Sequence, residues 1–165
     1  MLLKIQPVFW GGIFSSIITT KRNVRAIGMQ ETKIYFYYMQ KEDSVYDDGN
    51  EVKFIPQYNP PLKIQSEYNI AASQMEYYSY YFDNTGKLIF YLEISNGEYG
   101  SSKKLFWFDN MKLIRAENYG ASDLNTKKDG ILKDEDFKEA ERIKTKADNY
   151  LKEYYNLFKI ELLDK

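Results

Sequence analysis

Four consecutive residues, Ser101, Ser102, Lys103 and Lys104, come closest in this sequence to a nucleophile with a base beside it. A serine hydroxyl needs an adjacent base to become a nucleophile, and the chain contains no His and no Cys. Neighbouring residues on a strand point to opposite faces, so a serine and the lysine next to it are not expected to meet. We therefore predict that the protein is not an enzyme. A small hydrolase that uses carboxylates or a Ser–Lys pair remains the alternative.

The segment from Asn125 to Asp136 has the length of an EF-hand calcium loop and part of its pattern. Gly130 stands at the sixth position and Leu132 at the eighth, as that loop requires. However, Lys127 occupies the third position, where an oxygen ligand belongs, and the twelfth position holds Asp instead of Glu. We predict no metal site and no cofactor, and instead a turn followed by the start of a helix.

Aromatic residues are the one compositional excess, because they make up 17% of the chain and 16 of them are Tyr. Tyr favours strands and half-buried faces, so the excess first indicates β-structure. A face of such rings can also stack on a sugar or pack against a protein, so we expect a protein or glycan partner. The formal net charge of −1 argues against nucleic acid as a partner, since that binding needs clustered cations.

The stretch from Glu76 to Glu117 contains one short pattern twice. Residues 80–89 are Tyr-Tyr-Phe-Asp-Asn-Thr-Gly-Lys-Leu-Ile, and residues 106–114 are Phe-Trp-Phe-Asp-Asn-Met-Lys-Leu-Ile. An aromatic run, Asp-Asn, a short turn and Lys-Leu-Ile together predict a β-hairpin. Gly86 suits a turn position with positive φ, and Asn110 with the following Met suits a two-residue turn.

The expected pairing within these hairpins assigns each side chain to one face of a sheet. If Asp83 pairs with Lys87, then Phe82, Phe90 and Leu92 share the more apolar face, which is predicted to be the core side. The rings predicted for the opposite face form the candidate binding surface: Tyr77, Tyr81, Tyr91, Phe106 and Phe108. Rings that ladder across strands can also serve stability alone, so a purely structural role stays open.

Three further β-forming runs precede the hairpins, at 33–39, 51–55 and 62–68, with a break at Asn59-Pro60-Pro61. Together these segments predict an antiparallel meander of six or seven strands over residues 31–119.

Apolar residues then recur every three or four positions from Phe137 to Phe158. This period predicts an amphipathic helix over residues 134–160, with Asp134 as its N-cap and its apolar stripe on one face of the sheet. The chain is thus predicted to be a single α+β domain over residues 1–165.

Residues 1–30 are predicted to form an irregular or edge segment. The apolar run from Ile5 to Ile18 is interrupted by Pro7, Gly11 and Gly12 and is too short to span a membrane. Three alternatives stay open for it: a strand or loop packed on the core, an export signal, and an interface segment. As packing, it can also supply a cover for the second face of the sheet.

The pattern of residues 80–89, with its variant at 106–114, resembles the short hairpin repeats called YD or MORN-type. It is equally similar to small bacterial proteins of the Bacteroidetes type with a Phe-Asp-Asn-Gly-Lys-Leu-Ile-Arg hairpin, often behind an export signal. This resemblance implies a binding or structural role in the periplasm or outside the cell, and it transfers no catalytic residue. Together with the aromatic face it favours a non-enzymatic binding or structural module. The alternatives are the hydrolase and an immunity- or inhibitor-type protein.

Overall fold

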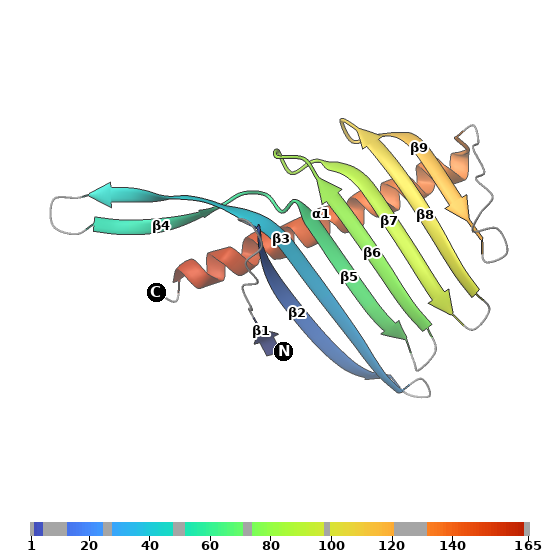
Figure 1. The fold of residues 1–165 in the computed structure, drawn as a ribbon, viewed down its shortest axis with the longest axis horizontal. Helices are drawn as coiled ribbons and strands as arrows, with labels where there is room; N and C mark the ends of the chain where they lie inside the picture. Colours follow the sequence, from blue (N-terminus) through green and yellow to red (C-terminus); the bar gives the residue numbers. More distant parts are fainter. Residues whose placement is uncertain are drawn as a thin grey trace.

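The computed structural model (Figure 1) describes residues 2–4, 13–24, 28–47, 52–70, 74–97, 100–120 and 132–163. Within these residues the chain forms a nine-stranded antiparallel sheet followed by one helix, so the predicted α+β architecture is confirmed. The elements are β1 (Leu2–Lys4), β2 (Ile13–Val24), β3 (Gly28–Asp47), β4 (Val52–Tyr58), β5 (Lys63–Ile70), β6 (Gln74–Phe82), β7 (Leu88–Gly97), β8 (Gly100–Asp109), β9 (Lys112–Tyr119) and α1 (Asp134–Leu163).

β3 is the longest strand, with 20 residues, and it connects two parts of the sheet. Its first part lies between β2 and β5, and its last part pairs with β4. β4 and β5 follow each other along β3 because Pro60 and Pro61, which lack an amide hydrogen, interrupt the ladder at the predicted position. After the prolines the N–H of Leu62 donates to the carbonyl of Tyr37 at 2.7 Å, and the pairing of β5 with β3 begins at the next residue. The β3–β4 arm therefore projects beyond the other strands (Figure 1).

The turns of the twin hairpins have the predicted conformations. Gly86 has a φ of +83°, in the region that favours glycine. Asp83 stabilises this turn, since its Oδ1 accepts hydrogen bonds from the backbone N–H groups of Thr85 and Lys87 at 2.8 and 2.9 Å. In the second hairpin Asn110 has a φ of 46°, and Met111 follows with 64°. Two consecutive positive φ angles are the signature of a type I′ turn, which matches the twist of the flanking strands.

Each hairpin also contains a β-bulge, and beyond the bulge the predicted register is wrong, although the pairs next to the turns are as predicted. In the first hairpin the ladder passes from Leu88 to Phe90, so Ile89 has no partner. In the second hairpin Ile114 is left out in the same way. Ile89 and Ile114 are each the last residue of a Lys-Leu-Ile sequence, so the bulge occurs at the same position of the repeated pattern in both hairpins. Next to the first turn the pairing of Phe82 with Leu88 is as predicted, and Phe82 lies in the core. Beyond the bulge the extra residue shifts β7 to the opposite face, so Phe90 and Leu92, which were predicted for the core side, lie on the other face.

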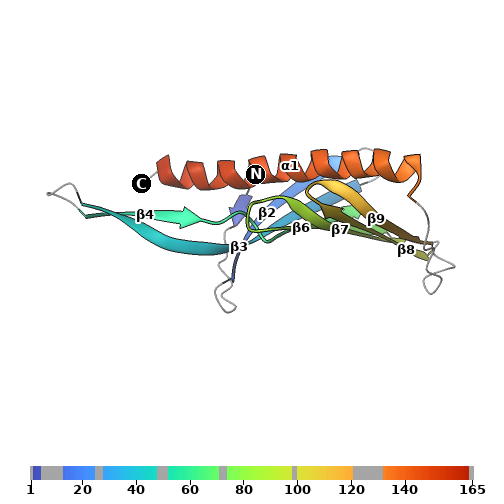
Figure 2. The same ribbon diagram turned by 90° about the horizontal axis from the view of Figure 1, so that it is seen from above.

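α1 lies along one side of the sheet, which we call the inner face (Figure 2). The carbonyl of Lys133 accepts the first helical hydrogen bonds, and its N–H donates to Oδ2 of Asp136 at 2.8 Å. Lys133 is therefore the N-cap, one residue before the predicted Asp134, and Asp136 acts as the returning acid of a capping box.

The predicted stripe of α1 is largely buried against the inner face. Its buried residues are Ala140, Ile143, Ala147, Tyr150 and Tyr154. Leu151 packs at the margin of the core, whereas Phe137 is exposed. The side chain of Phe158 is not among those that the structure describes.

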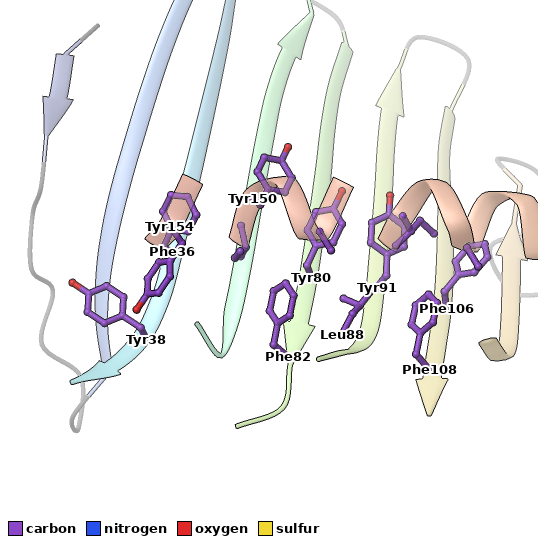
Figure 3. Packing of buried hydrophobic residues seen from close by; sticks show 14 of the residues in the cluster. Phe36, Tyr38, Tyr80, Phe82, Leu88, Tyr91, Phe106, Phe108, Tyr150 and Tyr154 are labelled. Atoms are coloured by element: carbon purple, nitrogen blue, oxygen red, sulfur yellow. The ribbon is translucent and has the colours of Figure 1, made fainter. Parts of the chain in front are cut away.

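The core lies between α1 and the inner face and is built mainly of rings (Figure 3). One row crosses five consecutive strands of the sheet: Phe36, Ile64, Tyr80, Tyr91 and Phe106. The ring of Tyr80 lies 5.0 Å from that of Tyr91 and 5.4 Å from that of Tyr150 in α1. Ring contacts between helix and sheet thus stabilise the docking of α1.

Part of the segment 1–30 is more regular than predicted. β2 pairs with β3 from Ile13 to Val24, and β1 pairs with β2 at the edge of the sheet. Phe14 stacks on Tyr38 with ring centroids 6.0 Å apart, so β2 contributes to the core. Of the residues 1–30 that were predicted as a possible cover for the second face, Phe14 packs against the core instead and Ile13 is exposed, whereas residues 5–12 lie outside the described residues. No helix in the described part of the chain is long and apolar enough to cross a membrane.

Candidate binding surface

The structure divides the five rings of the predicted binding surface between the two faces of the sheet. Tyr91, Phe106 and Phe108 lie in the core, with exposed fractions of 2%, 1% and 5%, so their predicted place on an open face is wrong. Tyr77 and Tyr81 lie on the opposite side, which we call the outer face, and are half-buried. None of the described elements covers this outer face, because α1 lies on the other side (Figure 2).

The outer face presents three parallel rows of side chains that run across β3 and β5 to β9. The first, which we call the aromatic row, consists of Tyr37, Lys63, Tyr81, Phe90, Trp107 and Arg115. The middle row consists of Tyr35, Gln65, Ser79, Leu92, Leu105 and Glu117. The third row consists of Lys33, Glu67, Tyr77, Ile94, Lys103 and Tyr119.

Rings and cations are in continuous contact along the aromatic row. The ammonium of Lys63 lies 5.4 Å from the ring centroids of both Tyr37 and Tyr81. The ring of Tyr81 is 5.4 Å from that of Phe90, which in turn is 5.2 Å from that of Trp107. The guanidinium of Arg115 covers Trp107 at 4.9 Å and ends the row. Cation–π and tilted ring contacts therefore engage the ring faces, so the row offers mainly ring edges to an incoming molecule.

The charged groups near the aromatic row are paired within the outer face. Lys63 Nζ donates to Oε1 of Gln65 at 2.7 Å, and Gln65 Nε2 donates to Oε1 of Glu67 at 3.0 Å. The hydroxyl of Tyr35 donates to Oε2 of Glu67 at 3.1 Å. Burial, helped by the negative charge of Glu67, raises the pKa of Tyr35 to about 12. This phenol is therefore a stable donor at neutral pH and not a titrating group.

A second polar cluster closes the outer face at β9. Glu117 is buried, and its carboxylate accepts hydrogen bonds from Arg115 and from the hydroxyl of Tyr119, the latter at 2.7 Å. Buried carboxylates are stable only when paired in this way. Arg115 thus links the buried acid to the ring of Trp107.

Exposed apolar side chains lie on the same face. By strand pairing, four of the large hydrophobic residues that are exposed belong to it: Ile13, Met29, Met39 and Met75. Methionine is flexible and polarisable, and it is common at surfaces that adapt to a partner. The outer face thus combines a packed aromatic row with exposed methionines.

Beneath α1 the polar groups are also paired, and they include Lys104, one of the two lysines of the Ser–Lys alternative. The hydroxyl of Tyr91 donates to Oε2 of Glu93 at 2.8 Å, and Lys104 Nζ binds the other oxygen at 2.8 Å. Burial, followed by the neighbouring Tyr80 and Glu93, raises the pKa of Tyr91, so this phenol stays protonated. Because the ammonium of Lys104 is held by Glu93, it is not available to deprotonate Ser102 on the same strand face.

The described residues contain no group of three or more His, Cys, Asp or Glu side chains that could hold a metal ion. Most of the calcium-like segment Asn125–Asp136 lies outside the described residues. The carboxylate of Asp136, its last residue, accepts the hydrogen bond from Lys133 N–H at the start of α1. The expectation of no metal and no cofactor stays a prediction.

Most of the aromatic row was not among the predicted binding residues, including Lys63, Trp107 and Arg115. A signal was present after the first turn, where Leu88, Ile89 and Phe90 form an unbroken apolar run. Strict alternation fails there, and such a failure next to a turn is typical of a bulge.

No family model, curated protein or solved structure matches this chain. The resemblance of the hairpins to YD or MORN-type repeats therefore stays a prediction.

Proposed function

We propose that the protein is a non-enzymatic binding module and that the outer face of the sheet is its binding surface. The observation that supports this most is the aromatic row, in which rings and cations stay in contact across six strands on a face that no described element covers. Binding surfaces are enriched in Tyr, Trp, Phe, Met and Arg. That composition matches the row and the exposed methionines of the same face, of which Met39 lies two residues from Tyr37.

The contacts within the aromatic row favour a protein partner over a glycan. A sugar or a nucleobase stacks on an open ring face. Here Lys63 and Arg115 lie over ring faces, and Phe90 packs between its two neighbours. A stacked ligand would have to displace these contacts, whereas a protein surface can pack on ring edges and methionines. A partner protein is also what an immunity- or inhibitor-type role requires.

A purely structural role accounts for the ring contacts but not for the exposed methionines. Rings that ladder across strands stabilise the sheet without any partner. Met29, Met39 and Met75 are exposed, so they add little to that stabilisation. A partner that covers the outer face explains both observations together.

A displayed random-peptide library tests the proposal. Peptides are selected on the wild type and compared on Tyr81→Ser with Trp107→Ser, and on the matched helix control Phe137→Ser with Tyr155→Ser. Circular dichroism and melting curves establish that each variant is folded. Met39→Lys, which changes one exposed side chain only, serves as a milder outer-face variant. We expect selected peptides to bind the outer-face variant at least about 30-fold more weakly, as for loss of an interface hot spot of about 2 kcal/mol. Equal binding to a wild type and an outer-face variant that are both monomeric under the assay conditions would contradict the proposal. Chito- and cello-oligosaccharides, titrated in parallel, test the glycan alternative.

A further inference from the structure

The outer face has the size of one ordinary protein interface. It extends over seven strands, β2, β3 and β5 to β9, which at about 4.8 Å between strands gives roughly 29 Å. Strands of eight to ten residues at about 3.3 Å per residue add a length of roughly 28 Å. The resulting area of roughly 800 Å² equals what each partner contributes to a standard interface. One bound peptide strand would cover only a fraction of it.

The shape of the outer face restricts which partner can cover it. β-sheets have a twist of fixed hand, so a second sheet packs flat on the first only if its own twist is similar. In such sandwiches the sheets lie about 10 Å apart and their strands cross at about 30°. A second copy of this chain meets this requirement without further adjustment, because its outer face has the same twist.

The charges of the outer face are compatible with a copy of itself. Its anions are already paired: Glu31 with Lys21 and Lys33, Glu67 with neighbouring donors, and Glu117 with Arg115. The formal net charge of the chain is only −1, so two copies do not strongly repel each other. A strongly acidic or basic partner would find few unpaired charges to attract it. Recognition by this face is therefore mainly apolar, through its rings and methionines.

We infer that the outer face joins two copies of this chain, packed sheet against sheet, with an α1 helix on each outside. This inference rests on the proposed function, because it names the partner of the same surface. The aromatic rows of the two copies then lie in one buried layer together with the exposed methionines.

Sedimentation velocity over a range of protein concentrations tests the inference. Met29→Lys with Met75→Lys places charges on exposed outer-face positions, and the matched control, Phe137→Lys with Tyr155→Lys, makes the same change on α1. The four side chains are similarly exposed, at 60%, 41%, 47% and 43%, so neither double variant should impair folding. We expect wild type and control to sediment at twice the chain mass of 19.6 kDa. The outer-face variant should dissociate at least about tenfold more readily. Wild type that stays monomeric up to about millimolar concentration, or two variants that dimerise equally, would overturn the inference.

Introduced cysteines test the geometry, because the chain has none of its own. Leu92→Cys lies in the middle row, and Tyr155→Cys on α1 is the control. A bismaleimide that spans roughly the 10 Å between packed sheets should link two copies through Leu92→Cys and not through the control. Equal linking of both, or of neither, contradicts face-to-face packing. If the protein is monomeric and its outer face still selects peptides, the dimer is overturned and the proposed function stands. If the protein neither dimerises nor selects peptides through its outer face, both proposals are overturned.

Discussion

Tyr80 lies in the middle of the core with its side chain fully buried, and its hydroxyl has no hydrogen-bond partner in the described part of the chain. Burial raises the pKa of this phenol, so it remains a neutral group that has lost its hydration. A buried hydroxyl without a partner costs about 1–3 kcal/mol in protein mutants. The ring itself packs against Tyr91 and Tyr150 and should be kept.

Tyr80→Phe removes only the hydroxyl, and we expect it to stabilise the protein. The variant no longer has to bury a hydroxyl without a partner, so the free energy of unfolding should rise by about 1 kcal/mol. For a domain of this size that corresponds to a rise in Tm of about 2–4 °C. Tyr91→Phe is the matched control on the neighbouring strand. It removes a hydroxyl that donates to the buried Glu93, so we expect a loss of about 1.5–3 kcal/mol.

Urea unfolding curves at pH 7, followed by circular dichroism, give the free energy of unfolding for the three proteins. The opposite sign of the two changes is the test, since both remove the same atom from the same kind of buried ring. If Tyr80→Phe destabilised the protein as much as Tyr91→Phe does, the hydroxyl of Tyr80 would have a bonding partner, and the reasoning from its isolation would be refuted.

Three further changes test the turn, its acid and the metal prediction. Gly86→Val should cost at least about 1 kcal/mol in urea curves, because the φ of +83° is strained for a residue with a branched side chain. An unchanged midpoint would contradict this. Hydrogen bonds from the N–H of Lys87 and, to a lesser degree, from the hydroxyl of Thr85 hold the pKa of Asp83 below its usual value. The ionised Asp83 therefore stabilises the folded protein above about pH 4, and this stabilisation is lost as the pH falls through the lowered pKa. Asp83→Asn should therefore weaken the acid dependence of Tm, and identical pH profiles would argue against it. Millimolar Ca²⁺ should leave Tm unchanged, and a rise of several degrees would show that an ion binds the folded state.

The parts of the fold that depend on local chemistry could be predicted from the sequence. Gly86 and Asn110 specify their turns through backbone preference alone, and the stripe from Ala140 to Tyr154 follows from helical period. The start of α1 was misplaced by one residue because Asp134 and Asp136 can both act as capping acids. The choice depends on which carboxylate reaches the N–H of Lys133.

The faces of the hairpin strands could not be predicted, because they depend on pairing across the sheet. Ile89 and Ile114 are each one unpaired residue, and each shifts its strand by one position relative to its partner. Tyrosine gives no independent check, since its ring suits a core and its hydroxyl suits a surface. The sequence alone therefore does not decide between the two faces for Tyr81 and Tyr91, and the position of the bulge does. β2 was predicted only as one of three alternatives, since Ile17 and Ile18 are both apolar and its alternation is weak.

The order of elements along the chain has a consequence for synthesis. The sheet is complete by Tyr119, but the helix that covers its inner face begins only at Asp134 and follows every strand. A ribosome adds roughly 5–20 residues per second, so the nascent sheet would present the rings of Phe36, Tyr80 and Phe106 until α1 has emerged. During that interval no described element covers the rings of the inner face, which makes the chain prone to aggregation. Translation that stalled before residue 134 would thus leave a chain that depends on chaperones, even though all nine strands had been made.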